Sequence, residues 1–182
     1  MRVFLAIHLP VAVKESLAQM QACLARDLSG VRWVDPEKMH LTLFFWADFP
    51  CEAVSKLKKV VSSVAIEKEP FEVSLGSWGV FPHKENPRVL WVGLQKGKEQ
   101  MLLFHKSLKK ELLCLDIEFA DKHFVPHITL GRVKKIQLNK CSSLLDEAIS
   151  EVTFSVNSVS AVHSVLKPSG SEYRQLFAVS FT

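Results

Sequence analysis

Apolar residues recur at two spacings along this chain, and the spacing predicts where helices and strands alternate. Steps of three and four residues, as in Val13, Leu17, Met20 and Leu24, gather apolar side chains on one face of a helix. These steps predict four helices: one that opens at Pro10 and ends at Gly30, one that opens at Pro50, one with its stripe over 101–115, and one over about 138–150.

Alternation of apolar and polar residues, or a short apolar run between turn signals, predicts the strands that separate these helices. A glycine-punctuated segment covers 76–81, and a polar loop covers His83–Pro87. The expected strands are Val3–His8, Val31–Val34, Met39–Trp46, Phe71–Leu75, Arg88–Leu94, Ile117–Phe119, His127–Val133, Val152–Val156, Val159–Leu166 and Tyr173–Phe181.

The order of elements occurs twice, which indicates an internal duplication. The run Arg2-Val-Phe-Leu-Ala-Ile-His8 is echoed by Arg88-Val-Leu-Trp-Val-Gly-Leu94. Each run is followed by a helix, a short strand and a strand that carries a His-x-Thr motif. The first motif histidine lies 38 residues after the arginine of its run, and the second lies 39 residues after it. Repeats of about 1–82 and 87–167 within one domain, 1–182, predict two similar lobes related by a pseudo-twofold axis.

Composition narrows the class of protein without identifying a ligand. The 182 residues are 48% hydrophobic, which is enough for a packed core, and the formal net charge is +4. This mildly basic balance is compatible with an anionic ligand. The apolar stretches are too short for a membrane span, and 3–9 is expected to be a strand and not a signal peptide. The four scattered cysteines indicate reduced, mostly buried thiols in a cytoplasmic protein.

The two motifs are His40-Leu-Thr-Leu43 and His127-Ile-Thr-Leu130. The sequence holds seven histidines and four threonines, and half of the threonines stand in these two motifs. Residues i and i+2 of a strand point to the same face, so each motif presents an imidazole beside a hydroxyl. The apolar residues between them take the other face, which is expected to pack on helices. Two such polar faces turned toward each other would form a four-point site.

Two imidazoles and two hydroxyls suit acid–base cleavage of a phosphodiester. One imidazole accepts a proton from the attacking oxygen, and the other donates a proton to the leaving oxygen. The hydroxyls and nearby cations hold the non-bridging oxygens while negative charge develops on them. The scheme needs no metal and no cofactor. Because the pseudo-twofold axis makes the motifs nearly equivalent, this chemistry alone does not decide which histidine is the acid.

Other interpretations of the same residues are weaker. The histidines could be ordinary strand residues and the threonines plain strand formers, but the paired repeat would then be a coincidence. A zinc site lacks a carboxylate or thiolate at ligand spacing. Arg132 falls on the face opposite His127 in a regular strand, and it reaches a phosphate only if the strand ends or bulges near Gly131. Tyr173, Trp78 and Phe81 could stack a base or belong to the core.

Several segments resemble the two-histidine phosphoesterase superfamily, most closely the RNA 2′,3′-cyclic phosphodiesterases, also called 2′-5′ RNA ligases. Similar to that family are the opening run 2–10, the run Trp33-Val-Asp-Pro-Glu-Lys-Met-His-Leu-Thr-Leu43, and the runs 87–93, 126–132 and 170–173. The resemblance covers essentially the whole chain. It implies an α+β fold of two lobes, each an antiparallel sheet with outer helices, around a central cleft.

The resemblance also implies an activity and residue roles. The activity is hydrolysis of a terminal RNA 2′,3′-cyclic phosphate to a 2′-phosphomonoester, with reversible 2′-5′ joining and without metal or cofactor. His40 would be the proton donor and His127 the proton acceptor. Thr42, Thr129, Arg132 and Tyr173 would bind an RNA end, and the protein would act as a monomer in the cytoplasm. This chain has Gly131 where the family often has Ala, and Phe45-Trp46 where it often has Leu-Gly.

Two rival functions remain open at this stage. One is a protein that binds RNA ends without cleaving them. The other is a phosphodiesterase of the same superfamily that acts on a different cyclic or 2′-5′-linked nucleotide.

Overall fold

The structure is a computed structural model that describes residues 1–120, 123–134, 152–168 and 170–182. Three α-helices and nine strands are present in these ranges. In chain order the elements are β1 (Val3–His8), α1 (Val11–Asp27), β2 (Val31–Trp33), η1 (Pro36–Lys38), β3 (His40–Trp46), η2 (Cys51–Ala53), α2 (Val54–Ala65), β4 (Phe71–Phe81), β5 (Val89–Leu94), α3 (Lys98–Cys114), β6 (His127–Val133), β7 (Thr153–Val156), β8 (Ser158–Lys167) and β9 (Gly170–Ser180).

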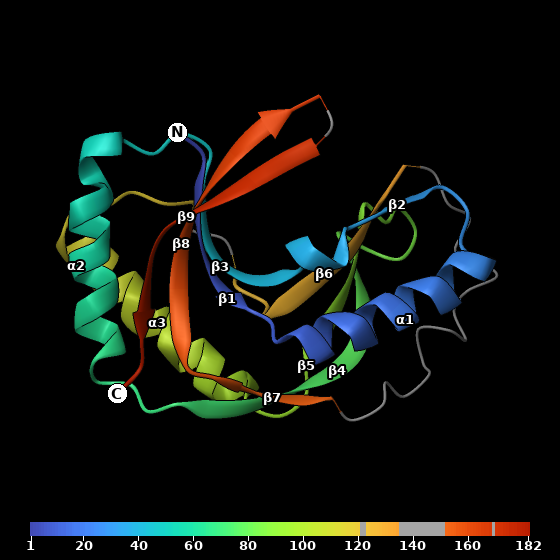
Figure 1. Ribbon diagram of the computed structural model, residues 1–182, viewed down its shortest axis with the longest axis horizontal. Helices are drawn as coiled ribbons and strands as arrows, with labels where there is room; N and C mark the ends of the chain where they lie inside the picture. Colours follow the sequence, from blue (N-terminus) through green and yellow to red (C-terminus); the bar gives the residue numbers. More distant parts are fainter. Residues whose placement is uncertain (121–122, 135–151, 169) are drawn as a thin grey trace.

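The fold is α+β, with one large antiparallel sheet as its framework (Figure 1). Its strand order is β7-β4-β5-β6-β3-β1-β8-β9, and β2 pairs with β6 beside this path. The sequence predicted two separate sheets. The strands instead form one connected path, because β3 and β6 pair where Leu41 lies opposite Ile128. The two motif strands therefore lie side by side in the middle of the sheet.

Two strands pair with strands that belong to the other half of the sequence. β4 comes from the first half but pairs with β5 of the second half. β8 comes from the second half but pairs with β1 of the first half. We refer to β4 and β8 as the exchanged strands. Each motif strand is also flanked by strands from both halves of the chain, because β3 pairs with β1 and β6, and β6 pairs with β3 and β5.

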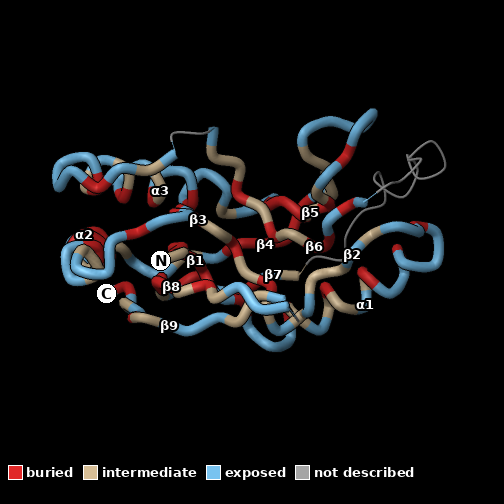
Figure 2. Tube along the Cα trace, turned by 90° about the horizontal axis from the view of Figure 1, so that it is seen from above, coloured by how far each residue is buried: buried red, intermediate tan, exposed pale blue. Residues whose placement is uncertain are grey.

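The helices cover the sheet with the apolar faces that their spacing predicts. α2 and α3 pack against each other at one end of the molecule, and α1 lies at the other end (Figures 1 and 2). The hydrophobic core joins the inward side chains of the motif strands, such as Leu41 and Ile128, to all three helices. The buried apolar helix residues are Val13, Leu17, Leu24, Leu57, Val60, Val61, Val64, Ala65, Met101, Phe104, Leu108 and Leu112.

Most predicted strands are confirmed, and the bounds of β1 and β6 agree to the residue. The strand predicted at Ile117–Phe119 is wrong. This segment has no ladder partner, because the Ile117 N–H donates to the Leu112 carbonyl and the Glu118 carbonyl accepts from the Trp46 indole. The helix predicted over about 138–150 lies outside the described residues.

β4 is a single strand where the sequence predicted a strand and a separate glycine-rich segment. The pairing register of β4 with β5 shifts between Leu75 and Trp78, which marks a β-bulge. At Gly76 a Cβ atom would lie 2.8 Å from the backbone of Leu94 and Gln95, so the close approach of the two strands requires glycine there.

Cys23, Cys51 and Cys114 are free but exposed, whereas the sequence predicted mostly buried thiols. Among the described residues, no helix has the length and apolar content needed to cross a membrane.

Candidate active site

The two motif strands place their histidines and threonines on one face of the sheet. β3 and β6 have the same burial pattern residue for residue, with half-buried histidine and threonine and buried Leu41 and Ile128 between them. In an antiparallel pair, the register of Leu41 with Ile128 brings His40 next to Thr129 and Thr42 next to His127. The imidazoles therefore occupy one diagonal of a four-residue array, and the hydroxyls occupy the other.

The two imidazoles are oriented by the same local hydrogen bond. His40 Nδ1 lies 2.7 Å from the Lys38 carbonyl, and His127 Nδ1 lies 2.7 Å from the Val125 carbonyl. A carbonyl oxygen only accepts, so each Nδ1 carries the proton and donates it. This arrangement leaves Nε2 of both rings as the nitrogen that binds and releases a proton.

Burial shifts both imidazoles toward their neutral forms. Burial lowers the pKa of His40 to about 4; the Lys38 carbonyl opposes the shift, while His8 and His127 add to it. Burial also lowers the pKa of His127, and the Val125 carbonyl opposes that shift. At neutral pH both imidazoles are therefore neutral. A ring that is to act as an acid must gain its proton together with an anionic ligand, whose charge raises the imidazole pKa.

A β-bulge in each motif strand brings the residue three positions after the threonine back to the motif face. Leu43 is the extra residue of β3, since Leu5 pairs with Phe44 and Ala6 with Thr42. Leu130 is likewise the extra residue of β6. Because each bulge adds one residue, the alternation of faces is reset after it. Arg132 consequently lines the same cleft as Thr129, which satisfies the condition that the sequence set for it.

The bulge of β6 is held from outside the sheet by Gln21 of α1. Gln21 is only 7% exposed, and its side-chain nitrogen donates to the carbonyls of Leu130 and Val34, each at 2.8 Å. The Leu130 carbonyl also accepts from the Val34 N–H, so Gln21 supplies a second donor that ties the bulge to α1. Close packing adds to the constraint, because a Cβ atom at Gly131 would lie 2.4 Å from the Val31 side chain.

Different aromatic residues border the two histidines. Phe4 stacks on the His40 ring with centroids 4.6 Å apart, and Tyr173 meets His40 edge-on at 5.6 Å. Phe81 and Trp91 meet the His127 ring edge-on at 5.0 and 6.0 Å. These rings exclude water from one side of each imidazole, which is consistent with the lowered pKa values.

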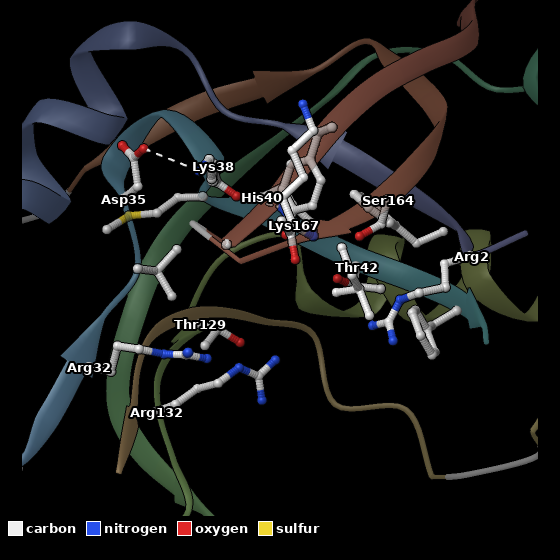
Figure 3. A pocket seen from close by; sticks show the side chains of 18 of the residues that line it. Arg2, Arg32, Asp35, Lys38, His40, Thr42, Thr129, Arg132, Ser164 and Lys167 are labelled. Carbon is white, nitrogen blue, oxygen red and sulfur yellow. Dashed lines mark hydrogen bonds and ion pairs between the residues drawn. The ribbon is translucent and has the colours of Figure 1, made fainter. Parts of the chain in front are cut away.

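A basic cleft of about 570 Å³ opens on the motif face (Figure 3). This volume lies in the range of small-molecule sites. Cations outnumber acids among the lining residues, since Arg2, Arg32, Arg132, Lys38 and Lys167 face one carboxylate, that of Asp35. The carboxylate is already paired with Lys38, at 3.7 Å. The cleft therefore suits an anionic ligand.

Five of the six predicted site residues line this cleft: His40, Thr42, Thr129, Arg132 and Tyr173. His127 borders the cleft without lining it, and its charge affects the pKa of His40.

Phe4, Trp91, Arg2 and Arg32 were not predicted for the site. The parity of Phe4 on β1 could have indicated it, because it shares a face with Ala6, which pairs with Thr42. The strand pairing that brings Arg32 opposite Arg132 has no local sequence signal.

No three His, Cys, Asp or Glu side chains of the described residues come together as a ligand set for a metal ion.

Comparison with known proteins gives a consistent result over the full length. The sequence profile of the family described as LigT like Phosphoesterase matches residues 7–91 and again 92–173. The RNA 2′,3′-cyclic phosphodiesterase of Thermotoga maritima is 30% identical over 182 residues, covering 100% of this chain and 96% of that protein. The protein of the same name from Archaeoglobus fulgidus is 31% identical, covering 97% and 98%.

Solved structures show the same fold. The protein TT0787 of Thermus thermophilus matches with a TM-score of 0.83 and 28% identity, covering 100% of this chain and 98% of that one. LigT of E. coli, crystallised with 3′-AMP, matches with a TM-score of 0.80, covering 100% and 98%. Its identity of 19% makes this a likeness of fold alone.

Proposed function

This chain belongs to the LigT-like phosphoesterase family, and we propose that it hydrolyses the 2′,3′-cyclic phosphate at the end of an RNA to a 2′-phosphomonoester. One observation carries the proposal. Two imidazoles stand on one sheet face, each with Nδ1 fixed on a carbonyl and Nε2 left to exchange a proton. A reaction that needs one acid and one base uses such a pair directly.

The proposed step transfers two protons. Water attacks the phosphorus atom, and His127 Nε2 accepts the proton that the water loses. The bond between phosphorus and the 3′-oxygen breaks, and His40 Nε2 donates its proton to that oxygen. The products are a 2′-phosphomonoester and a 3′-hydroxyl. His40 is left neutral and His127 protonated, and exchange with solvent restores the starting forms.

The remaining groups of the cleft bind the phosphate in this proposal. The Thr42 and Thr129 hydroxyls donate to the non-bridging oxygens, and Arg132 contributes positive charge and a forked set of donors. Tyr173, which is 38% exposed at the cleft, offers a ring for the terminal nucleoside. The residues named here perform the step without a metal ion or cofactor.

The same arrangement supports joining. If the 5′-hydroxyl of a second RNA replaces water as the nucleophile, the same two proton transfers give a 2′-5′ phosphodiester and a 3′-hydroxyl. The reverse of that step regenerates the cyclic phosphate.

The direct test is single-turnover cleavage of a short RNA that ends in a 2′,3′-cyclic phosphate, in the presence of EDTA. We expect a 2′-phosphate product and an unchanged rate after chelation. Loss of activity in EDTA that zinc restores would replace this mechanism with a metal-dependent one. Binding without turnover would leave an RNA-end-binding protein.

Comparison of substrates decides between this function and the nearest alternative. A cyclic mononucleotide and a 2′-5′ dinucleotide should react more slowly than the cyclic-phosphate RNA, because they fill less of the cleft or lack its reactive end. If either reacts faster, the protein is a phosphodiesterase for another cyclic or 2′-5′-linked nucleotide.

We further propose that the active unit is a cytoplasmic monomer. One chain supplies both motif strands, and the exposed, unpaired Cys23, Cys51 and Cys114 suit a reducing compartment. Light scattering on the purified protein and fractionation of cells test the two statements separately.

A further inference from the structure

Arg2 brings a guanidinium group to the cleft that no described carboxylate neutralises. The residue directly precedes β1 and lines the cleft together with Thr42 and Ser164 (Figure 3). Its Nε atom is buried and has no hydrogen-bond partner among the described residues. A buried donor of a charged group is costly when it is left unpaired. The guanidinium group as a whole lines the open, basic cleft, where its charge is available to an anionic ligand.

An aromatic ring fixes the position of this guanidinium. The Arg2 guanidinium carbon lies 5.1 Å from the centroid of the Phe45 ring, a cation–π contact. Phe45 pairs with Phe4 across β1 and β3, so Arg2 is its diagonal neighbour on the same face. Phe45 is 44% exposed toward the cleft, which is unusual for its type and is explained when its role is to seat a cation.

Each side of the cleft has one guanidinium group, but the two groups come from different positions relative to the motif strands. Phe45 and Arg132 are equivalent positions, since each follows a bulge and stands three residues after its threonine. In β6 the motif strand itself supplies the guanidinium. In β3 that position is aromatic, and the neighbouring chain segment supplies the guanidinium. Both groups lie near the Tyr173 hydroxyl, where each opposes the burial that raises the pKa of Tyr173.

We propose that Arg2 binds the phosphate group of the substrate from the β3 side of the cleft, as the counterpart of Arg132. The inference rests on the proposed function for the reaction that the bound phosphate undergoes. Binding by Arg2 requires only that the ligand carry a phosphate anion. The planar fork of Arg2 donates to non-bridging oxygens while Phe45 holds it in orientation. The site then contacts the phosphate with one guanidinium from each side.

The first experiment measures binding of inorganic phosphate by ³¹P NMR titration at fixed ionic strength, without turnover. Arg2→Met keeps an apolar stem on Phe45 and removes the fork. We expect its Kd to rise about tenfold to a hundredfold, the range for one hydrogen bond to a charged group. Arg2→Lys keeps the charge and should fall between the two proteins. Arg26→Met, at an exposed position on α1, is the matched control and should bind like the wild type.

Phosphate binding by folded Arg2→Met equal to that of the wild type overturns the proposal. If Arg2→Met does not fold by circular dichroism, Arg2→Lys decides, and an unchanged Kd in that variant overturns it as well. Turnover of the cyclic-phosphate RNA separates the two proposals. Weakened phosphate binding in Arg2→Met, with a wild type that does not cleave the RNA, supports the Arg2 site and contradicts the proposed function.

Discussion

Strands β3 and β6 carry the same motif on nearly the same backbone but stand in different surroundings. Both have the burial pattern of a His-x-Thr strand with a bulge at the following leucine, and both anchor Nδ1 on the carbonyl two residues earlier. Around His40 stand Phe4, Tyr173 and a second histidine, His8. Around His127 stand Phe81 and Trp91.

The duplicated backbone and the side chains around it contribute differently to the site. The backbone alone makes two equivalent proton-exchanging groups. Burial lowers both pKa values, and His8 and His127 lower that of His40 further, so the surrounding side chains make the two imidazoles unequal. A bound anion must raise the pKa of His40 before this ring can donate the proton assigned to it.

The largest expected effect comes from removing either imidazole. His40→Ala and His127→Ala should each lower kcat/KM by roughly 10²–10⁴, and the double variant by much less than the product, because acid and base act as a unit. Single-turnover cleavage of the cyclic-phosphate RNA measures this. His163→Ala, a strand histidine outside both motifs, is the control and should keep its activity.

A substrate with a sulfur leaving group should distinguish the His40→Ala variant from the His127→Ala variant. With sulfur in place of the 3′-oxygen, the leaving group departs as a thiolate and needs no proton donor. This substrate should restore much of the activity of His40→Ala and none of that of His127→Ala. The opposite result would exchange the roles of the two histidines.

The pH dependence tests the difference in surroundings. Because both imidazole pKa values are lowered in the free protein, kcat/KM should peak below pH 6.5 and fall about tenfold per pH unit on the alkaline side. Bound phosphate favours the protonated ring and so raises its pKa, which moves the alkaline limb of kcat to higher pH.

Initial rates between about pH 4 and 9, with NMR titration of the imidazoles, give both profiles. The sulfur-containing substrate is the control, because it needs only the base and should lose the alkaline limb. A kcat/KM that stays flat from about pH 6 to 8 with the oxygen substrate would contradict the prediction.

Substitution of the two threonines tests whether their hydroxyls contribute equally to phosphate binding. Thr42→Ala and Thr129→Ala should each lower kcat/KM about tenfold, since each removes one hydrogen bond to a charged group and leaves proton transfer in place. Thr→Ser at the same positions keeps the hydroxyl and should recover most of the rate. A loss confined to one strand would mean that the phosphate sits nearer to that strand.

The smallest expected effect comes from Gln21, which holds the bulge of β6. Gln21→Leu removes one donor from the part-buried Val34 carbonyl and one from the buried Leu130 carbonyl, which keeps its bond from the Val34 N–H. It should lower the free energy of unfolding by about 1–2 kcal/mol. It should also lower kcat/KM roughly fivefold by loosening Arg132, a loss of about 1 kcal/mol in transition-state stabilisation. Gln19→Leu, on the exposed side of α1, should change neither quantity.

Combination with Arg132→Met decides whether Gln21 acts through that residue. If it does, the double variant should be no slower than Arg132→Met alone. Additive losses would show an independent effect. Thermal unfolding of all three variants separates stability from rate.

The sequence predicted β3 and β6 well because their apolar residues alternate with polar ones and turn signals bound them. It left the face of Arg132 dependent on a bulge near Gly131, since parity assumes a regular strand and the bulge depends on contacts with α1 and β2. It predicted a strand at 117–119 from apolar composition alone. Whether such a segment finds a ladder partner is decided by the rest of the fold.

The alignment of the two similar runs, 2–8 and 88–94, is also shifted by one residue relative to the structure. They align Phe4 with Leu90, whereas the pairing with the motif strands makes Phe4 equivalent to Val89. The distances of 38 and 39 residues from arginine to histidine already contained this one-residue difference. A shift of one residue exchanges the two faces of a strand, so the echo could not show that Trp91 faces His127.

The exchanged strands make the two halves of the chain interdependent in folding. Without β8, β1 keeps an open edge, and without β4, β5 does the same, so a lone half exposes unpaired backbone that invites aggregation. Pairing β1 with β8 joins residues far apart in sequence, which raises the contact order and slows folding. We therefore expect a chain cut within 83–87 to fold only when both fragments are present together.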